Sequence, residues 1–410
     1  MSQTHAQNAA TQAGAGPGST APEAGSAAPR AVPAAGYQAQ TNALRPQAQP
    51  TLPPAVTDWS RRVRANFARW DTDSDGWLSM PELNAHLANP AIQGDDAAAL
   101  SALHYKISDL EELSNDEVGD ENDGVTVADL LAYERGQAAT PDSSVANVEA
   151  AHAAGQRAVT TAAQVRAAHG GERATANSNE LFPNGLPSLD ALRQGMLGDC
   201  YFLAALGGML ARDPSSIVRM IRRNRDGNAV TSYTVTFAGA IGAQTVAPPT
   251  DGELARYSSS GIDGLWLPVI EKAYAQGRGG AGVNRQTEIG EGGSISSGID
   301  AFTAGGTDSD DLWCTDVATT KTKLQNALNG RPAKIVTANL ASENELHLPS
   351  GHAYTVLAFD GSVMTLRNPW GHHPANVPAT AAGFVRLPNG QFTMTPELFD
   401  SIFFQISYQE

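Results

Sequence analysis

The chain contains few cysteines and few basic residues. Cys200 and Cys314 are its two cysteines among 410 residues, too few for the disulfide framework of a small secreted scaffold or for a cysteine-rich zinc site. Lys and Arg number 27 against 43 Asp and Glu, which gives a formal net charge of −16. Because nucleic acids and anionic membranes attract basic surfaces, we expect neither as a partner.

Long hydrophobic segments are also missing. The longest apolar run extends from Tyr201 to Ala211, well short of the roughly 20 residues that a membrane-spanning helix needs. The N-terminal residues contain neither the basic stretch nor the apolar core of a secretory signal. We therefore expect a cytoplasmic protein by default, with leaderless secretion as the alternative. The sequence predicts no particular oligomeric state.

Composition and hydrophobic periodicity divide the chain into five regions. Sixteen Ala, eight Pro and only three charged residues among the first 55 predict a disordered tail, 1–57. Residues 58–136 show four helical patterns in two helix–loop–helix units, with 17 Asp and Glu against 6 Lys and Arg. The Ala-rich residues 137–179 predict a linker that is helical over 143–168. A helical region, 180–303, with one strand-like run at 232–237, and a β-rich region, 304–410, complete an α+β fold.

A 12-residue acidic loop between the first two predicted helices has the spacing of an EF-hand calcium (Ca2+) site. Its oxygen-bearing residues stand at the positions that supply ligands to a hard cation, and Gly76 allows the sharp turn between them. Trp77 would contribute its backbone carbonyl, Ser79 a ligand through water, and Glu82 both carboxylate oxygens. The proposed metal ligands are Asp71, Asp73, Asp75, Trp77, Ser79 and Glu82.

A second acidic loop, 120–129, is a degenerate partner of the first. When Gly124 and Asp129 are aligned with Gly76 and Glu82, the second loop is two residues short. Four of its side chains could still hold an ion: Asp120, Asn122, Asp123 and Asp129. A loop that only pairs structurally with the first is the alternative.

Cys200 stands at the start of a helix predicted over 200–212, which Asp213 and Pro214 terminate. That helix is apolar nearly all round, which indicates burial. The positive end of a helix dipole stabilises a thiolate and can lower a thiol pKa from about 8.5 into the range of roughly 3.5–7.5. Cys200 is therefore a candidate nucleophile, and a buried structural cysteine is the alternative. Cys314 has no such position, and we expect it to be a packing residue.

His352 and Asn368 flank a predicted β-hairpin. His352 opens the strand pattern 352–359, and Asn368 follows the strand pattern 363–367. An Asn amide oxygen beside one ring nitrogen would leave the other nitrogen facing a thiolate. Trp370 could shield that hydrogen bond from water. A structural histidine is the alternative.

The turn of this hairpin must satisfy a geometric condition. A regular two-residue turn at Asp360-Gly361 would put the side chains of His352 and Asn368 on opposite faces of the sheet, because side chains alternate along a strand. An odd number of loop residues or a β-bulge would put both on one face. We therefore predict one of these two irregularities.

These residues resemble the signatures of the calpain family of papain-like cysteine proteases. The segment QGMLGDCYFLAAL, residues 194–206, resembles the family's cysteine signature, although Tyr201 stands where a Trp is usual. GHAYTV at 351–356 resembles the histidine signature, and RNPWG at 367–371 the asparagine signature. Further similar blocks are Trp266, EKAY at 271–274, FTAGG at 302–306 and residues 389–399, so that the resemblance covers roughly residues 180–410.

The resemblance implies a two-lobed cysteine endopeptidase that cleaves protein or peptide substrates. It implies Cys200 as the nucleophile, His352 as general base and then general acid, Asn368 as the residue that orients the imidazole, and Gln194 as an oxyanion donor. Calcium would regulate or stabilise the protein. The alternatives are a catalytically silent calcium-binding interaction protein on the same scaffold, and a transglutaminase-type acyltransferase, which Asn368 in place of Asp disfavours.

Overall fold

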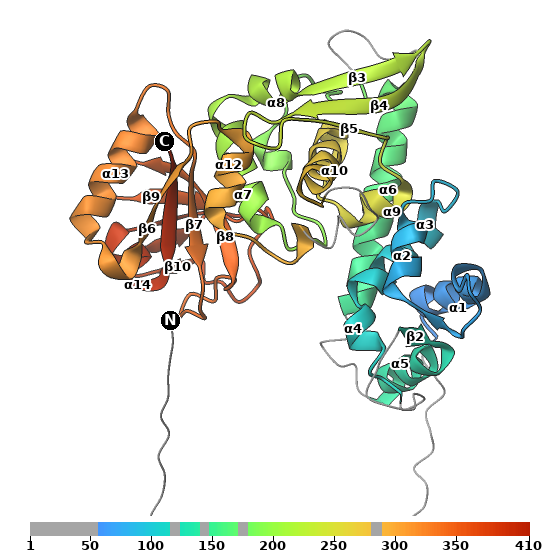
Figure 1. Cartoon of the computed structure of the whole chain (residues 1–410). Helices are drawn as coiled ribbons and strands as arrows, with labels where there is room; N and C mark the ends of the chain where they lie inside the picture. The colour runs from blue at the N-terminus through green and yellow to red at the C-terminus, as the bar shows by residue number, and fades with distance from the viewer. Residues whose placement is uncertain (1–55, 115–123, 140–146, 171–178, 280–288) are drawn as a thin grey trace, which may run out of the picture. The chain divides into compact units, whose positions relative to one another are not determined.

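The computed structural model describes residues 56–114, 124–139, 147–170, 179–279 and 289–410. The predicted tail lies outside these ranges except for its last two residues, and so do Asp120, Asn122 and Asp123 of the second acidic loop. All described elements belong to one unit of the chain, Leu52–Glu410. Figure 1 shows their order along the chain.

The N-terminal part consists of two helix–loop–helix units, as the sequence predicts. Helix α1 starts at a capping box in which Thr57 Oγ1 accepts a hydrogen bond from Ser60 N at 3.1 Å. It buries the predicted apolar face, which includes Trp59 and Trp70. The elements are α1 (Asp58–Trp70), β1 (Trp77–Leu78), α2 (Met80–Leu87), α3 (Gly94–Tyr105), α4 (Ile107–Leu110), β2 (Val125–Thr126) and α5 (Val127–Ala139).

The predicted linker contains a packed helix, α6 (Asn147–His169). Its first turns place Val148 in the hydrophobic core of the helix–loop–helix units, and its last turns place Val159 and Val165 in the core of the following region. In Figure 1, α6 runs beside α3 and α9 (Asp251–Arg256). The expected helix over 143–168 is therefore present from Asn147, and it joins its neighbours as part of their cores.

The region 180–303 is mainly helical but also contains a small sheet. Its α-helices besides α9 include α7 (Cys200–Arg212), α8 (Pro214–Met220), α10 (Trp266–Gly279) and α12 (Ile295–Phe302). The antiparallel strands β3 (Ile221–Asp226), β4 (Ala229–Thr236) and β5 (Ala243–Val246) form a three-stranded sheet. The run expected at 232–237 corresponds to β4, whereas β3 and β5 were not expected.

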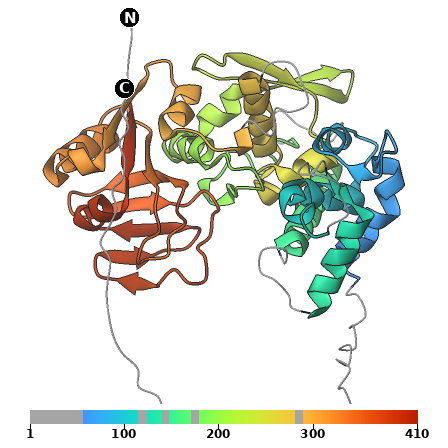
Figure 2. The same ribbon diagram turned by 60° about the horizontal axis from the view of Figure 1, so that its bottom comes forward.

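The C-terminal region is an eight-stranded antiparallel sheet in the order β10-β11-β12-β9-β8-β7-β13-β6. A helical region followed by this sheet confirms the α+β fold class. Figure 2 shows its strands in orange and red. The elements are β6 (Thr307–Asp311), α13 (Val317–Asn329), β7 (Val336–Leu340), β8 (His352–Phe359), β9 (Met364–Arg367), β10 (Thr380–Ala381), β11 (Phe384–Arg386), β12 (Gln391–Met394), α14 (Pro396–Ile402) and β13 (Gln405–Gln409).

Membrane crossing requires a helix that is both long and apolar. Among the helices in the described ranges, none meets both requirements.

Candidate active site and acidic loop

Cys200 is the first residue of α7, as predicted. Asp199 precedes it as the N-cap, and its carbonyl accepts the first hydrogen bonds of the helix, from Phe202 N and Leu203 N. Because α7 is buried along nearly its whole length, the position of Cys200 at its N-terminus is fixed. Cys200 is partly buried, and its sulfur lies beside β8, close enough to the Ala353 N–H for that group to favour the thiolate.

Close contacts hold α7 against β8. Thr355 Oγ1 donates a buried hydrogen bond to the Ala204 carbonyl at 2.7 Å. A Cβ atom at Gly207 would lie 2.7 Å from the same Thr355 oxygen, so this approach requires glycine. These contacts place the start of α7 next to the start of β8, and therefore Cys200 next to the segment that carries His352.

His352 and Asn368 form the predicted pair. His352 Nε2 lies 2.9 Å from Asn368 Oδ1, and the contact is buried. The same Oδ1 accepts the Trp370 N–H at 2.9 Å, which identifies this amide atom as the oxygen. The facing Nε2 must therefore carry the proton in neutral His352, so its Nδ1 has the free lone pair. The ring of Trp370 packs against the imidazole of His352, with the two ring centroids 4.9 Å apart.

A β-bulge brings the two side chains to one face. Phe359 pairs with Met364, but Val356 pairs with Leu366, so Leu357 is the extra residue between Val356 and Ala358. The bulge shifts the register by one, so that His352 and Asn368 share a face. The prediction of a bulge or an odd loop is confirmed through the bulge. The turn itself differs from the expected Asp360-Gly361, because Asp360 N donates to Val363 O around Gly361-Ser362.

Burial favours the neutral forms of both the Cys200 thiol and the His352 imidazole. It raises the pKa of the Cys200 thiol to about 11, although the Ala353 N–H acts in the opposite direction. It also lowers the pKa of His352 to about 4, although the hydrogen bond that Nε2 donates to Asn368 Oδ1 favours the protonated ring. The expectation that the helix dipole lowers the thiol pKa is therefore wrong for this arrangement, because desolvation outweighs the dipole.

Gln194 lies in a loop that is tied to the Asn368 segment. Its backbone N–H donates to Pro369 O at 3.0 Å, and the buried Arg367 Nη2 donates to Leu192 O at 2.7 Å. These bonds bring the predicted cysteine and asparagine signatures together. The Gln194 side chain donates from Nε2 to Leu197 O at 2.7 Å, which leaves its second N–H for another acceptor.

Two buried carboxyl groups belong to Glu271 and to Asp199, the residue before the candidate nucleophile. Asp199 and Glu271 are both fully buried, and Glu271 Oε2 accepts the Ser258 N–H at 2.6 Å. Both oxygens of Asp199 and Oε1 of Glu271 are buried without a hydrogen-bond donor in the described part of the chain. Burial raises the pKa of Asp199 to about 7 and that of Glu271 well above its usual value.

Sequence reasoning did not assign a role to this pair. Glu271 belongs to the EKAY block, but its partner stands 72 positions earlier in the chain. The one sequence feature that could have drawn attention to Asp199 is its position immediately before the candidate nucleophile, Cys200.

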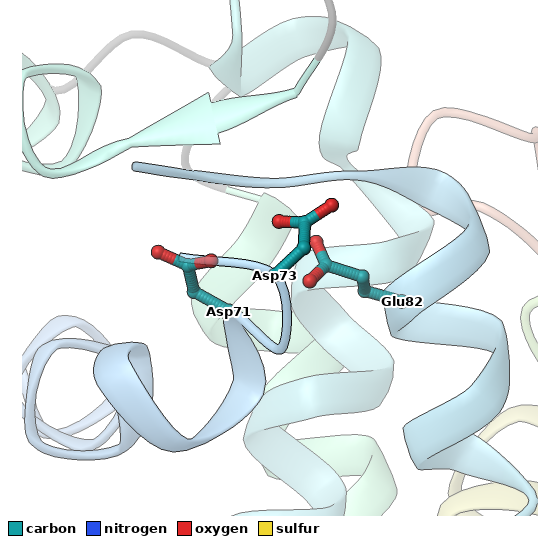
Figure 3. Close-up of side chains that lie close together, drawn as sticks. All are labelled: Asp71, Asp73 and Glu82. Atoms are coloured by element: carbon teal, nitrogen blue, oxygen red, sulfur yellow. The ribbon is translucent and has the colours of Figure 1, made fainter. Parts of the chain in front are cut away.

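The first acidic loop brings together three of its six predicted ligands. Carboxylate oxygens of Asp71, Asp73 and Glu82 lie within 4.8 Å of one another (Figure 3). Asp75 Oδ1 instead accepts the Trp77 N–H at 3.1 Å. Gly76 has a φ of +99°, which provides the sharp turn that the sequence predicts at this position.

Loop hydrogen bonds occupy both oxygens of Glu82. Oε1 accepts from Thr72 N and Oγ1 at 2.6 and 2.8 Å, and Oε2 accepts from Ser79 N and Oγ at 3.0 and 2.9 Å. Burial opposes the ionisation of Glu82, but these bonds outweigh it and lower its pKa. The carboxylate is thus ionised and placed at the loop, as a cation ligand requires.

The second loop repeats this arrangement at Asp129. This buried carboxylate accepts from N and Oγ of Ser114 and from N and Oγ1 of Thr126, at 2.7 to 2.9 Å. Strand β1 pairs with β2 through Leu78 opposite Val125. Thr126 and Asp129 therefore correspond to Ser79 and Glu82, which aligns Gly124 with Trp77. The alignment of Gly124 with Gly76 is corrected by one position.

Cys314 does not have the packing role expected of it. It is exposed at the end of a 3₁₀ turn, Leu312–Cys314, in which Leu312 is the buried residue. The expectation was wrong because the turn directs only one of its apolar side chains into the core.

A cysteine-protease profile accounts for the part of the chain that contains these groups. The profile described as calpain family cysteine protease matches residues 160–378, more than half of the chain. The match includes Cys200, His352 and Asn368 and excludes the helix–loop–helix residues 58–136. The chain therefore belongs to the calpain family of cysteine proteases.

Individual calpains are similar over less than half of this chain. Calpain clp-4 of Caenorhabditis elegans is 28% identical over 211 residues, which are 44% of this chain and 27% of that protein. The calpain-1 catalytic subunit of Homo sapiens is 28% identical over 207 residues, 43% of this chain and 27% of that subunit. The calpain-type cysteine protease DEK1 of Arabidopsis thaliana is 29% identical over 199 residues, 43% of this chain and 9% of that protein. The chain thus spans about a quarter or less of these relatives.

Proposed function

We propose that the chain is a calcium-regulated cysteine endopeptidase with a papain-like two-lobed core and an EF-hand-like module. The observation that carries the proposal is the buried His352–Asn368 hydrogen bond beside the N-terminus of α7, where Cys200 stands. A nucleophile, a base and a group that orients the base are the parts that covalent peptide hydrolysis needs.

The tautomer of His352 determines which of its ring nitrogens can accept a proton. With Nε2–H held by Asn368, Nδ1 can take the thiol proton of Cys200. The thiolate then attacks the scissile carbonyl, and the C–N bond breaks as His352 gives its proton to the leaving amine. Water activated by His352 hydrolyses the resulting thioester and releases the second product and the free Cys200 thiol.

Gln194 is the proposed side-chain donor to the oxyanion, together with the backbone N–H of Cys200. The second N–H of its amide remains for this purpose beside the bond to Leu197 O. A donor aimed at a developing oxyanion typically contributes about 2.7–4 kcal/mol to transition-state stabilisation.

Calcium is the proposed cofactor, bound by the loop of Asp71, Asp73, Asp75, Trp77, Ser79 and Glu82. The three converging carboxylates and the ionised Glu82 support this assignment. A bidentate Glu82 would exchange its bonds to Thr72 and Ser79 for the cation, and this exchange would act on the start of α2.

Direct contacts connect α2 with the loop before Cys200. The carbonyl of Leu87, the last residue of α2, accepts a hydrogen bond from Thr250 Oγ1 in the capping box of α9. The carbonyl of Arg256, the last residue of α9, accepts from Met196 N at 2.8 Å. A shift of α2 would therefore reach Met196, two residues after Gln194, and this continuity supports calcium control of the site.

Labelling with an epoxide or vinyl-sulfone thiol probe, with and without calcium, tests the proposal. We expect calcium-dependent labelling of Cys200 that His352→Ala abolishes, while the exposed Cys314 serves as the internal control. Equal labelling of both cysteines, unaffected by calcium and by His352→Ala, would instead favour a catalytically silent calcium-binding protein.

A further inference from the structure

A hollow next to the candidate active site lies between α6 and the loop before Cys200. It has a volume of about 680 Å³. Its lining includes a face of α6 that contains Arg157, the segment 193–196 and Tyr257. Most of the α6 wall precedes residue 160, where the match to the calpain profile begins.

The hollow is basic although the chain is strongly acidic. Arg157 and Arg193 are the charged side chains among its lining residues, and no Asp or Glu lines it in the described part of the chain. Neither arginine has a carboxylate within 4.0 Å among the described residues. The guanidinium of Arg193 donates to the backbone carbonyls of Asp190 and Leu192, which fix its place without pairing it directly with a carboxylate.

The hollow reaches the proposed catalytic machinery at Gln194. This residue lines the hollow, and its backbone N–H is bonded to Pro369 O next to Asn368. Its Oε1 atom is buried without a hydrogen-bond donor in the described part of the chain. Cys200 does not line the hollow. A peptide bound across Gln194 would therefore extend into the hollow on one side of its scissile bond.

We propose that this hollow is a substrate subsite that takes acidic side chains of the polypeptide being cleaved. The inference rests on the proposed protease function and adds a specificity to it. Arg157 and Arg193 would pair with an Asp or Glu of the substrate, and α6 would act as a specificity element outside the matched core. Arginine suits this role because its guanidinium forms charge-assisted, bidentate bonds with carboxylates.

Cleavage of a peptide library derived from unfolded proteins would reveal the specificity. The full chain, Arg157→Gln and Arg157→Glu would each digest the same library in calcium, and mass spectrometry would identify the cleaved bonds. For the full chain we expect enrichment of Asp and Glu on one side of the cleaved bond. We expect kcat/KM to be about tenfold higher for an acidic peptide than for its Gln isostere, as a charge-assisted hydrogen bond allows.

The variants should change this preference in steps. Arg157→Gln should reduce the enrichment, and Arg157→Glu should abolish it or reverse it towards Lys and Arg. Arg222→Glu, the same change at an exposed arginine of β3 that does not line the hollow, should retain the wild-type pattern. An unselective wild-type pattern, or an acidic preference unchanged in both Arg157 variants, would overturn the inference.

A binding assay separates this inference from the protease proposal. In a Cys200→Ala background, fluorescence anisotropy would compare a hexaglutamate peptide with a hexalysine peptide. We expect binding of the acidic peptide alone, weaker in Arg157→Glu and in high salt. If no chain cleaves the library but this binding pattern holds, the protease proposal fails and the hollow stands as a binding site for acidic peptides. If cleavage occurs but the acidic peptide does not bind, the subsite is refuted.

Discussion

In the arrangement that the structure shows, the thiol of Cys200 should react far more slowly than an ordinary cysteine. Burial raises its pKa to about 11, so only about one molecule in ten thousand carries the thiolate at pH 7. A free thiol of pKa about 8.5 is about 3% ionised at that pH. Because alkylating reagents attack the thiolate, we expect Cys200 to react about 300-fold more slowly than free cysteine.

The rate of iodoacetamide alkylation as a function of pH measures this effect. A Cys314→Ser background leaves Cys200 as the single thiol. In excess chelator the rate should rise continuously from pH 6 to pH 9.5, because the raised pKa keeps the thiol protonated throughout this range. In calcium, activation requires a thiolate stabilised by His352, so a plateau near neutral pH should replace the continuous rise.

A plateau near neutral pH in excess chelator would refute this reasoning. It would show that the helix dipole and His352 already stabilise the thiolate despite the burial. His352→Ala is the control, since it should remove any plateau that depends on the imidazole and leave the continuous rise unchanged.

Three further predictions follow from particular contacts. Calcium at about a hundredfold excess over Kd should stabilise the folded chain by about 2.7 kcal/mol, and Asp71→Ala with Glu82→Ala should remove most of the resulting Tm shift in calorimetry. Gly207→Ala should destabilise the chain by about 1–3 kcal/mol in urea unfolding, because the new Cβ would lie 2.7 Å from Thr355 Oγ1. The control is Gly136→Ala in α5, where a new Cβ would have no atom within 4 Å; this variant should stabilise the chain by about 0.5–1 kcal/mol. Because the pKa of Asp199 is raised, the folded state binds more protons than the unfolded state between about pH 4 and 7, and the free energy of unfolding should fall as pH rises through this range. Asp199→Asn should flatten this fall, as measured by urea titration at each pH.

The sequence predicted the site well where its signals are local. Hydrophobic periodicity and the residues that end helices and strands predict a helix that begins at Cys200, a strand that begins at His352 and an Asn after the next strand. The need for a bulge also followed from the sequence, since the alternation of side chains makes the His352–Asn368 pair impossible without one. Its location at Leu357 did not follow, because a bulge depends on how both strands pack.

Polar edge elements were the part of the fold that the sequence did not predict. Strand β6 has the sequence TDSDD, which lacks apolar alternation because it is the last strand of the sheet and pairs only with β13. Strand β3 is likewise an edge strand, and only its first residue is buried. Such strands form because a neighbouring strand offers backbone hydrogen bonds. Their own side chains therefore show little of the hydrophobic alternation by which a strand is predicted.

Contacts between distant segments were likewise beyond sequence reasoning. The Ala-rich composition of 137–179 is compatible with a free spacer, and only the cores on both sides of α6 make it a packed helix. The desolvation that raises the pKa of Cys200 also depends on the assembled fold. A local helix-dipole argument predicted the opposite direction because it could not include burial.

Hydrolysis of an unfolded protein substrate by single-residue variants tests the central claim most directly. In calcium, the full chain and Cys314→Ala should cleave the substrate, whereas Cys200→Ala should not, with a thermal unfolding curve nearly unchanged from that of the full chain. Appreciable cleavage by correctly folded Cys200→Ala would contradict the account, because it would show that the nucleophile is not the thiol at the start of α7.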